Sequence, residues 1–356
     1  MLDDLDGQLA AACERLGLPA FRARQVRKWL LEKRAGGWDE MTDLPKGLRA
    51  ELADALRLWT AEVVKHSAAD DGAEKLLLQL AGGGRIECVL LRENVGPRAK
   101  QEGLRRTFCI STQVGCAMGC VFCASGLDGV ERNLTTGEIL EQVLLLERRL
   151  GPDERLSHLV VMGMGEPLAN LDNLLPALDE VSRPDGLGVS PRRITISTVG
   201  LPPAIRRLAA SEAGRRYRLA ISLHAPNDEL RSRLVPVNAK IGVDAVMAAA
   251  DDYYAASGRR LTFEYVLLAG LNDRPEHAHQ LVRLLAGRNA LLNVIPYNPV
   301  AGLPYETPSM EAQRRFREIL ETHGVPIRFR HRKGDKINAA CGQLRRSTPA
   351  GVVNPG

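Results

Sequence analysis

The sequence has few aromatic residues and no apolar run long enough to cross a membrane. Only 4% of its 356 residues are Phe, Trp or Tyr, whereas 45% are hydrophobic. We therefore expect a large core made mainly of Leu, Val, Ile and Ala, and no membrane association. Residues 1–6 are acidic and lack an apolar run, which argues against a signal peptide and predicts a cytoplasmic protein.

Cysteine is also scarce, and its distribution argues against a secreted disulfide framework. Four of the seven cysteines lie between residues 109 and 123, which is not the pattern of a small disulfide-stapled domain. Three of them, Cys116, Cys120 and Cys123, have the spacing C-x3-C-x2-C. Thiolates this close in sequence indicate one metal centre.

No fourth Cys or His follows nearby, whereas structural zinc sites close with four nitrogen or sulfur ligands. A four-iron cluster held by three thiolates keeps one iron open for a substrate. The spacing resembles that of radical S-adenosylmethionine (SAM) enzymes, in which the open iron binds the methionine end of SAM and passes it one electron. A reduced structural cysteine cluster and half of a zinc ribbon are the alternatives.

The length of the chain favours about two domains. Residues 1–58 have helical spacing, and the second helix presents Phe21, Val26, Trp29 and Leu30 on one face. Its basic residues, at 22–28, either contact RNA or form a solvated face. Residues 59–106 predict a β-hairpin or meander that leads into a basic linker. Glu87 lies inside the last of these strands, where pattern alone favours a solvent-facing edge over a catalytic base.

Strands and helices alternate over residues 107–346, which predicts a parallel sheet curved into a barrel or partial barrel. A capping box at residues 135–138 opens a helix that runs to about residue 150. The strands expected after it span residues 158–163, 193–197, 218–223, 262–267, 291–295 and 326–330. Residues 347–356 resemble a disordered tail.

The loops at the ends of these strands carry polar residues and glycines. In barrels of this kind the site lies at the carboxyl ends of the strands. Glycines let the backbone approach a ligand, and Glu166 can hold an ammonium group. Each loop alone has a plain structural explanation, but four at consecutive strand ends favour a bound cofactor. They contain Gly165 and Glu166, Ser197, then Ser222, Leu223 and His224, and Asn298.

The C-terminal segment is strongly basic over residues 328–336 and then contains a lone cysteine, Cys341. A lone cysteine in an apolar turn is normally an inert buried thiol. Beside Gly342 and basic residues it could instead be a reactive thiol of low pKa on an RNA-facing loop. The net charge of +5 is compatible with a polyanionic partner, although many basic proteins bind no nucleic acid.

Taken together, these motifs resemble the RlmN/Cfr family of radical-SAM rRNA adenine methyltransferases. The similarity covers nearly the whole chain. It includes residues 19–23 and 39–45, the cysteine triplet with residues 132–135, and the loops at 162–167, 221–228 and 295–299. It ends with Ala-Ala-Cys-Gly-Gln-Leu at residues 339–344. The resemblance implies a partial (β/α)6-type barrel, preceded by a small helical RNA-binding domain and a short β extension.

The resemblance also assigns roles to individual residues. The [4Fe–4S] ligands would be Cys116, Cys120 and Cys123. Cys341 would carry the methyl group, Cys109 would be the second redox cysteine, and Glu87 would be a proton acceptor. The residues that would contact SAM are Gly165, Glu166, Ser197, Ser222, Leu223, His224 and Asn298.

The reaction that the resemblance implies uses two SAM molecules per turnover. The first methylates Cys341, and the second yields a radical that activates this methyl group for addition to adenine carbon 2. Cys109 then attacks the Cys341 sulfur, which forms a disulfide and releases the methylated RNA. The implied partners are 23S rRNA, tRNA, and an electron donor such as flavodoxin or ferredoxin, and a monomer is expected.

Three alternatives remain at this point. The Cfr branch of the family methylates carbon 8 of the same rRNA adenosine and confers antibiotic resistance. The helical module and residues 39–43 look more like the carbon-2 branch, whereas Ser125 departs from the threonine that this branch often has. A radical-SAM maturase of a non-RNA substrate and an RNA-binding zinc protein are the other two. For RNA contacts, residues 24–28 and 328–336 are the candidates.

Overall fold

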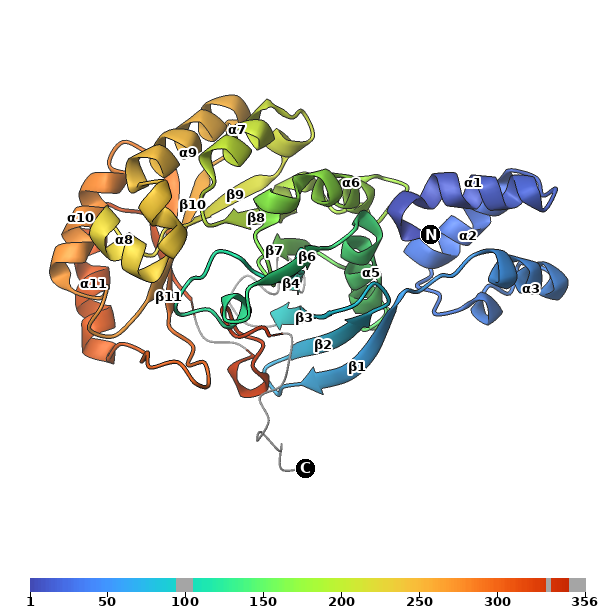
Figure 1. Ribbon diagram of the computed structural model, residues 1–356, viewed down its shortest axis with the longest axis horizontal. Coiled ribbons are helices and arrows are strands. Elements are labelled where there is room, and N and C mark those ends of the chain that lie inside the picture. Colours follow the sequence, from blue (N-terminus) through green and yellow to red (C-terminus); the bar gives the residue numbers. More distant parts are fainter. Residues whose placement is uncertain (94–104, 331–333, 346–356) are drawn as a thin grey trace.

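The computed structural model describes residues 1–93, 105–330 and 334–345 (Figure 1). Most of the predicted basic linker and the predicted tail therefore lie outside the described residues, as do residues 331–333 of the basic C-terminal segment. No helix within the described residues is both long and apolar enough to cross a membrane.

One 10-stranded sheet organises the fold, in the order β1-β2-β3-β4-β7-β8-β9-β10-β11-β12. The neighbours from β1 to β4 pair antiparallel, and those from β4 to β12 pair parallel. The strands are β1 (Ala61–Ala68), β2 (Ala73–Leu80), β3 (Arg85–Glu93), β4 (Arg105–Cys109), β7 (His158–Val161), β8 (Ile194–Thr198), β9 (Arg218–Ser222), β10 (Leu261–Leu267), β11 (Ala290–Pro296) and β12 (Ile327–Phe329).

The parallel strands follow one another in chain order, so each crossover joins neighbouring strands, as in a partial barrel. The predicted α/β class and parallel sheet are confirmed. The helices of this part are α5 (Thr136–Glu147), α6 (Leu171–Ser182), α7 (Pro202–Ala210), α8 (Asp228–Leu234), α9 (Val243–Ser257), α10 (Pro275–Leu285) and α11 (Met310–Thr322). The predicted capping box is present at Thr135 and Glu138 and fixes the start of α5.

Residues 113–133 form a separate two-stranded sheet with a long connecting loop. Strands β5 (Gln113–Gly115) and β6 (Val130–Asn133) pair antiparallel, and the loop between them contains the cysteine triplet. The backbone amide of Cys116 donates to the carbonyl of Gly129 at 2.9 Å. This short sheet closes the base of the cysteine loop.

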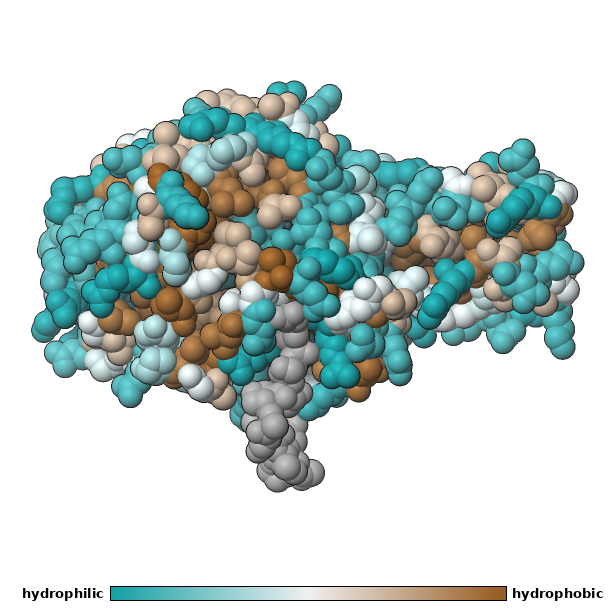
Figure 2. Space-filling model, in the orientation of Figure 1, coloured by the Kyte–Doolittle hydropathy of each residue, from teal (hydrophilic) through white to brown (hydrophobic). Residues whose placement is uncertain are grey.

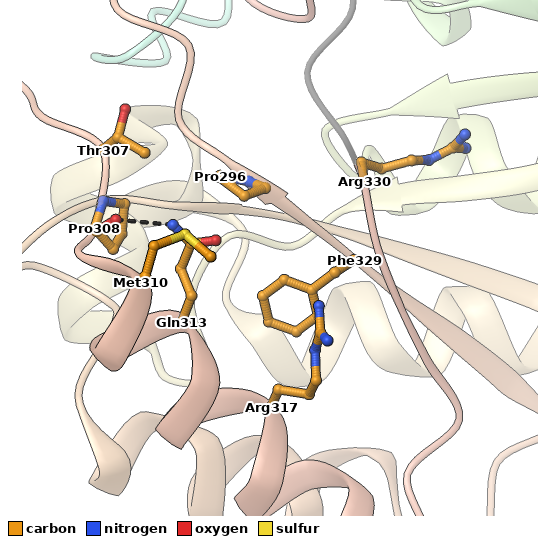
Figure 3. Close-up of a pocket in the computed structure, with 8 residues that line it drawn as sticks. All are labelled: Pro296, Thr307, Pro308, Met310, Gln313, Arg317, Phe329 and Arg330. Atoms are coloured by element: carbon orange, nitrogen blue, oxygen red, sulfur yellow. Dashed lines mark hydrogen bonds between the residues drawn. The ribbon is translucent and has the colours of Figure 1, made fainter.

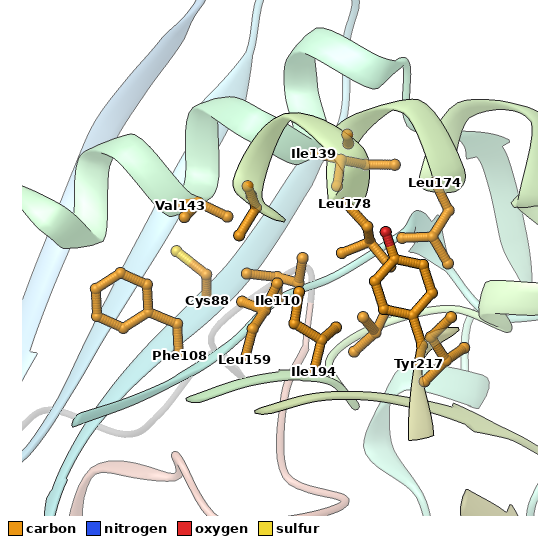
Figure 4. Close-up of a cluster of buried hydrophobic side chains, with 14 of the residues drawn as sticks. Cys88, Phe108, Ile110, Ile139, Val143, Leu159, Leu174, Leu178, Ile194 and Tyr217 are labelled. Carbon is orange, nitrogen blue, oxygen red and sulfur yellow. The ribbon is translucent and has the colours of Figure 1, made fainter. Parts of the chain in front are cut away.

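The main core lies between the strands and the helices α5 and α6 (Figure 4). Ile139 and Val143 of α5 and Leu174 and Leu178 of α6 face side chains from the strands. The residues drawn there include Cys88, Phe108, Leu159 and Ile194 of the strands, and Ile110 directly after β4. Hydrophilic residues cover much of the outer surface, with hydrophobic ones gathered toward the middle of the same face (Figure 2).

The N-terminal helices α1 (Leu5–Arg15), α2 (Phe21–Leu31) and α3 (Lys46–Ala55) project to one side of the sheet (Figure 1). Two expectations about α2 are wrong, each for one residue. Phe21 is 43% exposed, whereas Val26 and Leu30 of the same predicted apolar face are buried. Arg27, within the stretch proposed for RNA contact, is buried and pairs with Asp6 and Glu180. Its charge therefore docks the helical module onto α6.

Candidate active site

A cavity at the carboxyl ends of the parallel strands gathers most of the predicted site residues. Its wall comes from the cysteine loop, from the ends of β7 to β11, and from the C-terminal loop at residues 334–345. The predicted residues that line it are Cys116, Cys120, Cys123, Gly165, Glu166, Ser197, Ser222, His224 and Cys341. Four others, Leu223, Asn298, Cys109 and Glu87, lie outside this lining in the described structure.

The three thiols of the cysteine loop occupy one wall of the cavity and repel one another as thiolates. Burial, with a contribution from Cys123, raises the pKa of Cys116 to about 12. Burial and both neighbouring cysteines raise the pKa of Cys120 as well. A cationic metal centre reverses this effect, because a coordinated thiol loses its proton. The donor set therefore suits an iron–sulfur cluster, although no three such side chains in the described residues surround a single ion position.

Glu166 is a buried carboxylate that connects two strand ends. Its Oε1 accepts from the amide of Leu168 at 3.0 Å, and its Oε2 accepts from the amide of Val199 at 2.8 Å. Burial raises the pKa of Glu166, and the described residues form no ion pair with it. Gly165 before it has φ +104°, and a Cβ there would lie 2.7 Å from Cβ of Gln113, so glycine is required. A carboxylate held in this way is suited to an incoming ammonium group.

His224 has a fixed tautomer and a strained backbone. Its φ of 59° is left-handed, which is uncommon for residues other than glycine. Its Nδ1 accepts from the amide of Val266 at 3.0 Å, so the proton of the neutral ring is on Nε2. Burial and the charge of Arg231 lower the pKa of His224 to about 3. His224 is therefore a neutral hydrogen-bond donor at the cavity wall.

Arg231 of α8 is fully buried behind this wall, and sequence reasoning did not identify it. Its guanidinium donates to the carbonyls of Leu223 at 3.0 Å and Ser222 at 3.1 Å. It also donates to the carbonyl of Val199 and to Oδ1 of Asn238. One planar group thus fixes the residues that follow β8 and β9. No sequence pattern distinguishes it from the exposed arginines around it.

The loop that carries Cys341 is held on two sides. On the barrel side, Asn298 Nδ2 donates to the Cys341 carbonyl at 3.3 Å, and the Ala124 amide donates to the Gly342 carbonyl at 2.8 Å. On the side of the β extension, Lys75 Nζ donates to the Asn338 carbonyl at 2.9 Å. Asn298 therefore acts on the C-terminal loop here, although the resemblance implies a SAM contact.

Glu87 also holds this loop. Its Oε2 accepts from the Arg345 amide at 2.9 Å, and its Oε1 pairs with Lys75 Nζ at 2.8 Å. Burial raises its pKa in spite of Lys75. The expectation from pattern, a solvent-facing carboxylate at a sheet edge, is wrong, because Glu87 is buried and β3 lies inside the sheet.

Cys109 ends β4 and lies close to Cys341. Burial, with the nearby Cys341 thiol, raises the pKa of Cys109 to about 12. Both thiols are free. Cys341 is exposed, so it is not an inert buried thiol. Desolvation of its sulfur and the charge of Glu264 nevertheless raise the pKa of Cys341. The alternative of a low-pKa thiol is therefore wrong for this arrangement.

Glu264 is a second residue that sequence reasoning missed. It lies within β10, lines the cavity, and accepts at Oε1 from Asn293 Nδ2 at 3.0 Å. A carboxylate in the middle of the apolar run at residues 261–267 is the signal that could have identified it. Its position makes it a further acidic group beside Cys341.

Residues 110–282 match the Radical SAM superfamily, and residues 1–58 match the ribosomal RNA large subunit methyltransferase N-terminal domain. A probable dual-specificity RNA methyltransferase RlmN of Rhodopirellula baltica is 63% identical over 96% of this chain and 89% of the relative. This chain belongs to the RlmN family. The RlmN of Nitratidesulfovibrio vulgaris strain Miyazaki F is 47% identical over 93% of this chain and 90% of its own.

The solved structure of a radical SAM methyltransferase supports the fold. The crystal structure of a radical SAM methyltransferase from Sphaerobacter thermophilus superimposes with a TM-score of 0.90 at 42% identity. The match covers 98% of this chain and 99% of that one. Membership of this family makes the protein a radical SAM methyltransferase that uses a [4Fe–4S] cluster and SAM. It also excludes the zinc-protein and maturase alternatives.

Replacing Arg231 with Lys should destabilise the protein. Lysine has no planar fork, so several of the four acceptor groups around Arg231 would lose their donor inside the protein. We expect the free energy of unfolding to fall by about 3 kcal/mol, measured by urea denaturation. Arg233→Lys, at an exposed position of the same helix, is the matched control and should be neutral. Equal stability of the two variants would contradict the role assigned to Arg231.

Replacing Lys75 with Met should loosen the C-terminal loop. The variant removes the hydrogen bond to Asn338 and the partner of Glu87, each worth about 1 kcal/mol net. We expect amide hydrogen exchange over residues 334–345 to become about fivefold faster or more. The control is Lys65→Met, at an exposed position on the adjoining strand β1. Unchanged exchange in Lys75→Met would show that the loop is held without it.

Proposed function

We propose that this protein methylates carbon 2 of an adenosine in the peptidyl-transferase centre of 23S rRNA, and the tRNA adenosine 3′ to the anticodon. The observation that carries the proposal is the placement of Cys341, on a loop docked over a cavity lined by three cysteines and within electrostatic range of the Cys109 thiol. The relatives named dual-specificity RNA methyltransferases support the substrates.

The two lone cysteines answer a chemical problem. Carbon 2 of adenine is electron-poor and does not attack a methyl donor as an ordinary nucleophile. The bound cluster and SAM supply the electron, the methyl group and the radical chemistry. In the chain itself, the Cys341 sulfur holds the carbon that is transferred, and Glu166 and His224 position the cofactor from the loops that follow β7 and β9. We assign Cys116, Cys120 and Cys123 to the cluster.

Cys109 releases the RNA from its covalent bond to Cys341. Its thiolate attacks the Cys341 sulfur, and an S–S bond forms as the bond between this sulfur and the RNA-linked carbon breaks. The electron pair of that bond passes to the departing carbon, which takes up a proton. Two electrons from an external donor, of the flavodoxin or ferredoxin type, then restore both thiols. We propose a cytoplasmic location, because reduced thiols and a ribosomal substrate belong to that compartment. We also propose that the protein is a monomer.

Glu87 is proposed as a proton acceptor from its match to the family motif. Lys75 and the Arg345 amide occupy both of its oxygens in this structure. The proposed role therefore requires the C-terminal loop to shift when RNA is bound. Such a shift would release Oε2 from the Arg345 amide at the time when a proton has to leave the substrate, while Oε1 would stay paired with Lys75 of β2.

The position of the new methyl group tests the proposed function. The protein should be expressed in a bacterial strain that lacks its own carbon-2 methyltransferase, and 23S rRNA and tRNA should be digested and analysed by mass spectrometry. We expect 2-methyladenosine in both RNAs. Exclusive 8-methyladenosine would place the protein in the Cfr branch, and unmodified RNA in the presence of a loaded cluster would overturn the proposal.

The two cysteines should fail in different ways when each is replaced. Cys109→Ala should accumulate a covalent protein–RNA adduct, because nothing attacks the Cys341 sulfur. Cys341→Ala should form no adduct, because no sulfur receives the methyl group. Denaturing gel electrophoresis with labelled RNA distinguishes the two, and Cys88→Ala, which changes a buried core thiol, should turn over without an adduct. Normal turnover by Cys109→Ala would contradict the assignment.

A further inference from the structure

A second hollow lies beside the cavity, between α11 and the ends of β11 and β12 (Figure 3). We call it the α11 groove, and its wall includes Pro296, Met310, Gln313, Arg317, Phe329 and Arg330. Ile295, which lines the catalytic cavity, and Pro296 are the last two residues of β11, so both hollows reach the carboxyl end of this strand, on its two faces. Phe329 and Arg330 belong to the basic segment at residues 328–336, which the sequence made a candidate for RNA contact, and no role described above uses the other groove residues.

Two side chains of the α11 groove form a stacked pair. The Arg317 guanidinium carbon lies 4.3 Å from the centroid of the Phe329 ring, and Figure 3 shows the two groups side by side. Arg317 is exposed, so the far face of its guanidinium is open to a ligand. Met310 at the start of α11 is 78% exposed. Unpaired nucleobases stack on guanidinium planes as well as on aromatic rings, so the open face of Arg317, supported from behind by Phe329, is a surface on which a base can stack.

The charges of the groove are also free for a ligand. Arg314 and Arg315 of α11 pair with Glu318 and Glu311. In contrast, Arg317 and Arg330 form no ion pair among the described residues. The backbone of Arg330 is fixed, because its amide donates to the Val294 carbonyl at 2.9 Å. Arg330 lines the groove, and its charge also acts on Cys341 in the catalytic cavity.

We propose that the α11 groove binds an unpaired nucleotide next to the target adenosine. Its base stacks on the Arg317–Phe329 pair, and its phosphate is neutralised by Arg330. The proposal rests on the proposed action on RNA. A base that is extruded to reach a buried site leaves its neighbours partly unstacked, and those neighbours need another surface. The groove provides such a surface next to the cavity entrance.

The test measures RNA binding by the full-length, cluster-loaded protein under anaerobic conditions. A fluorescent RNA hairpin that carries the target adenosine in its loop is titrated at several salt concentrations. Arg317→Ala and Phe329→Leu should bind at least about fivefold more weakly, because each removes part of a stacking surface. Leucine keeps the apolar volume at position 329, so the fold is retained. Arg330→Gln should reduce the slope of log affinity against log salt by about 0.7.

The matched control is Arg283→Gln. Arg283 is exposed in the last turn of α10 and forms no ion pair among the described residues. The Arg283→Gln variant therefore removes one free positive charge at a site away from the groove. It should bind RNA like the wild type. Wild-type affinity in Arg317→Ala and Phe329→Leu, while the wild type methylates RNA, would overturn the groove proposal alone. A loaded wild type that neither binds nor methylates RNA would overturn both proposals.

Discussion

The arrangement of the site depends on how the loop around Cys341 is held. No disulfide bond holds this loop, because Cys341 is a free thiol in this structure. Lys75 and Glu87 of the β extension hold one side through backbone groups of the loop, and Asn298 and Ala124 hold the other. Each such bond contributes about 1 kcal/mol net, so together they position the thiol and can still be broken one by one. A loop held by such bonds can place Cys341 over the cavity, and it can move away again when the bonds break.

The rest of the site is rigid, because buried side chains within the barrel hold it in place. Arg231 and Glu166 join the residues that follow β7, β8 and β9 through buried, charge-assisted hydrogen bonds. Such bonds are costly to break in a low-dielectric interior. The β extension, through Lys75 and Glu87, therefore shares with Asn298 and Ala124 the task of holding the adjustable C-terminal loop against the rigid barrel.

Local patterns in the sequence predicted much of this arrangement. Strand–helix alternation predicted the parallel sheet, and the rule that sites lie at strand ends brought Glu166, Ser222 and His224 to one cavity. Contacts between distant segments could not be predicted in this way. The burial of Arg27 against Glu180, the docking of Glu87 on Arg345 and the contact of Arg231 with three carbonyls depend on tertiary packing. The proximity of Cys109 and Cys341, more than 200 residues apart, was available only through the family resemblance.

The central claim is that Cys341 and Cys109 form a redox pair, and disulfide mapping tests it most directly. The protein should be purified without oxygen, oxidised briefly with diamide in the absence of RNA, alkylated, and digested for peptide mass spectrometry. We expect a linked peptide pair that contains Cys109 and Cys341, with Cys88 recovered as a free thiol. A link between Cys88 and Cys109, or an alkylated Cys109 after Cys341 has been oxidised, would contradict the claim.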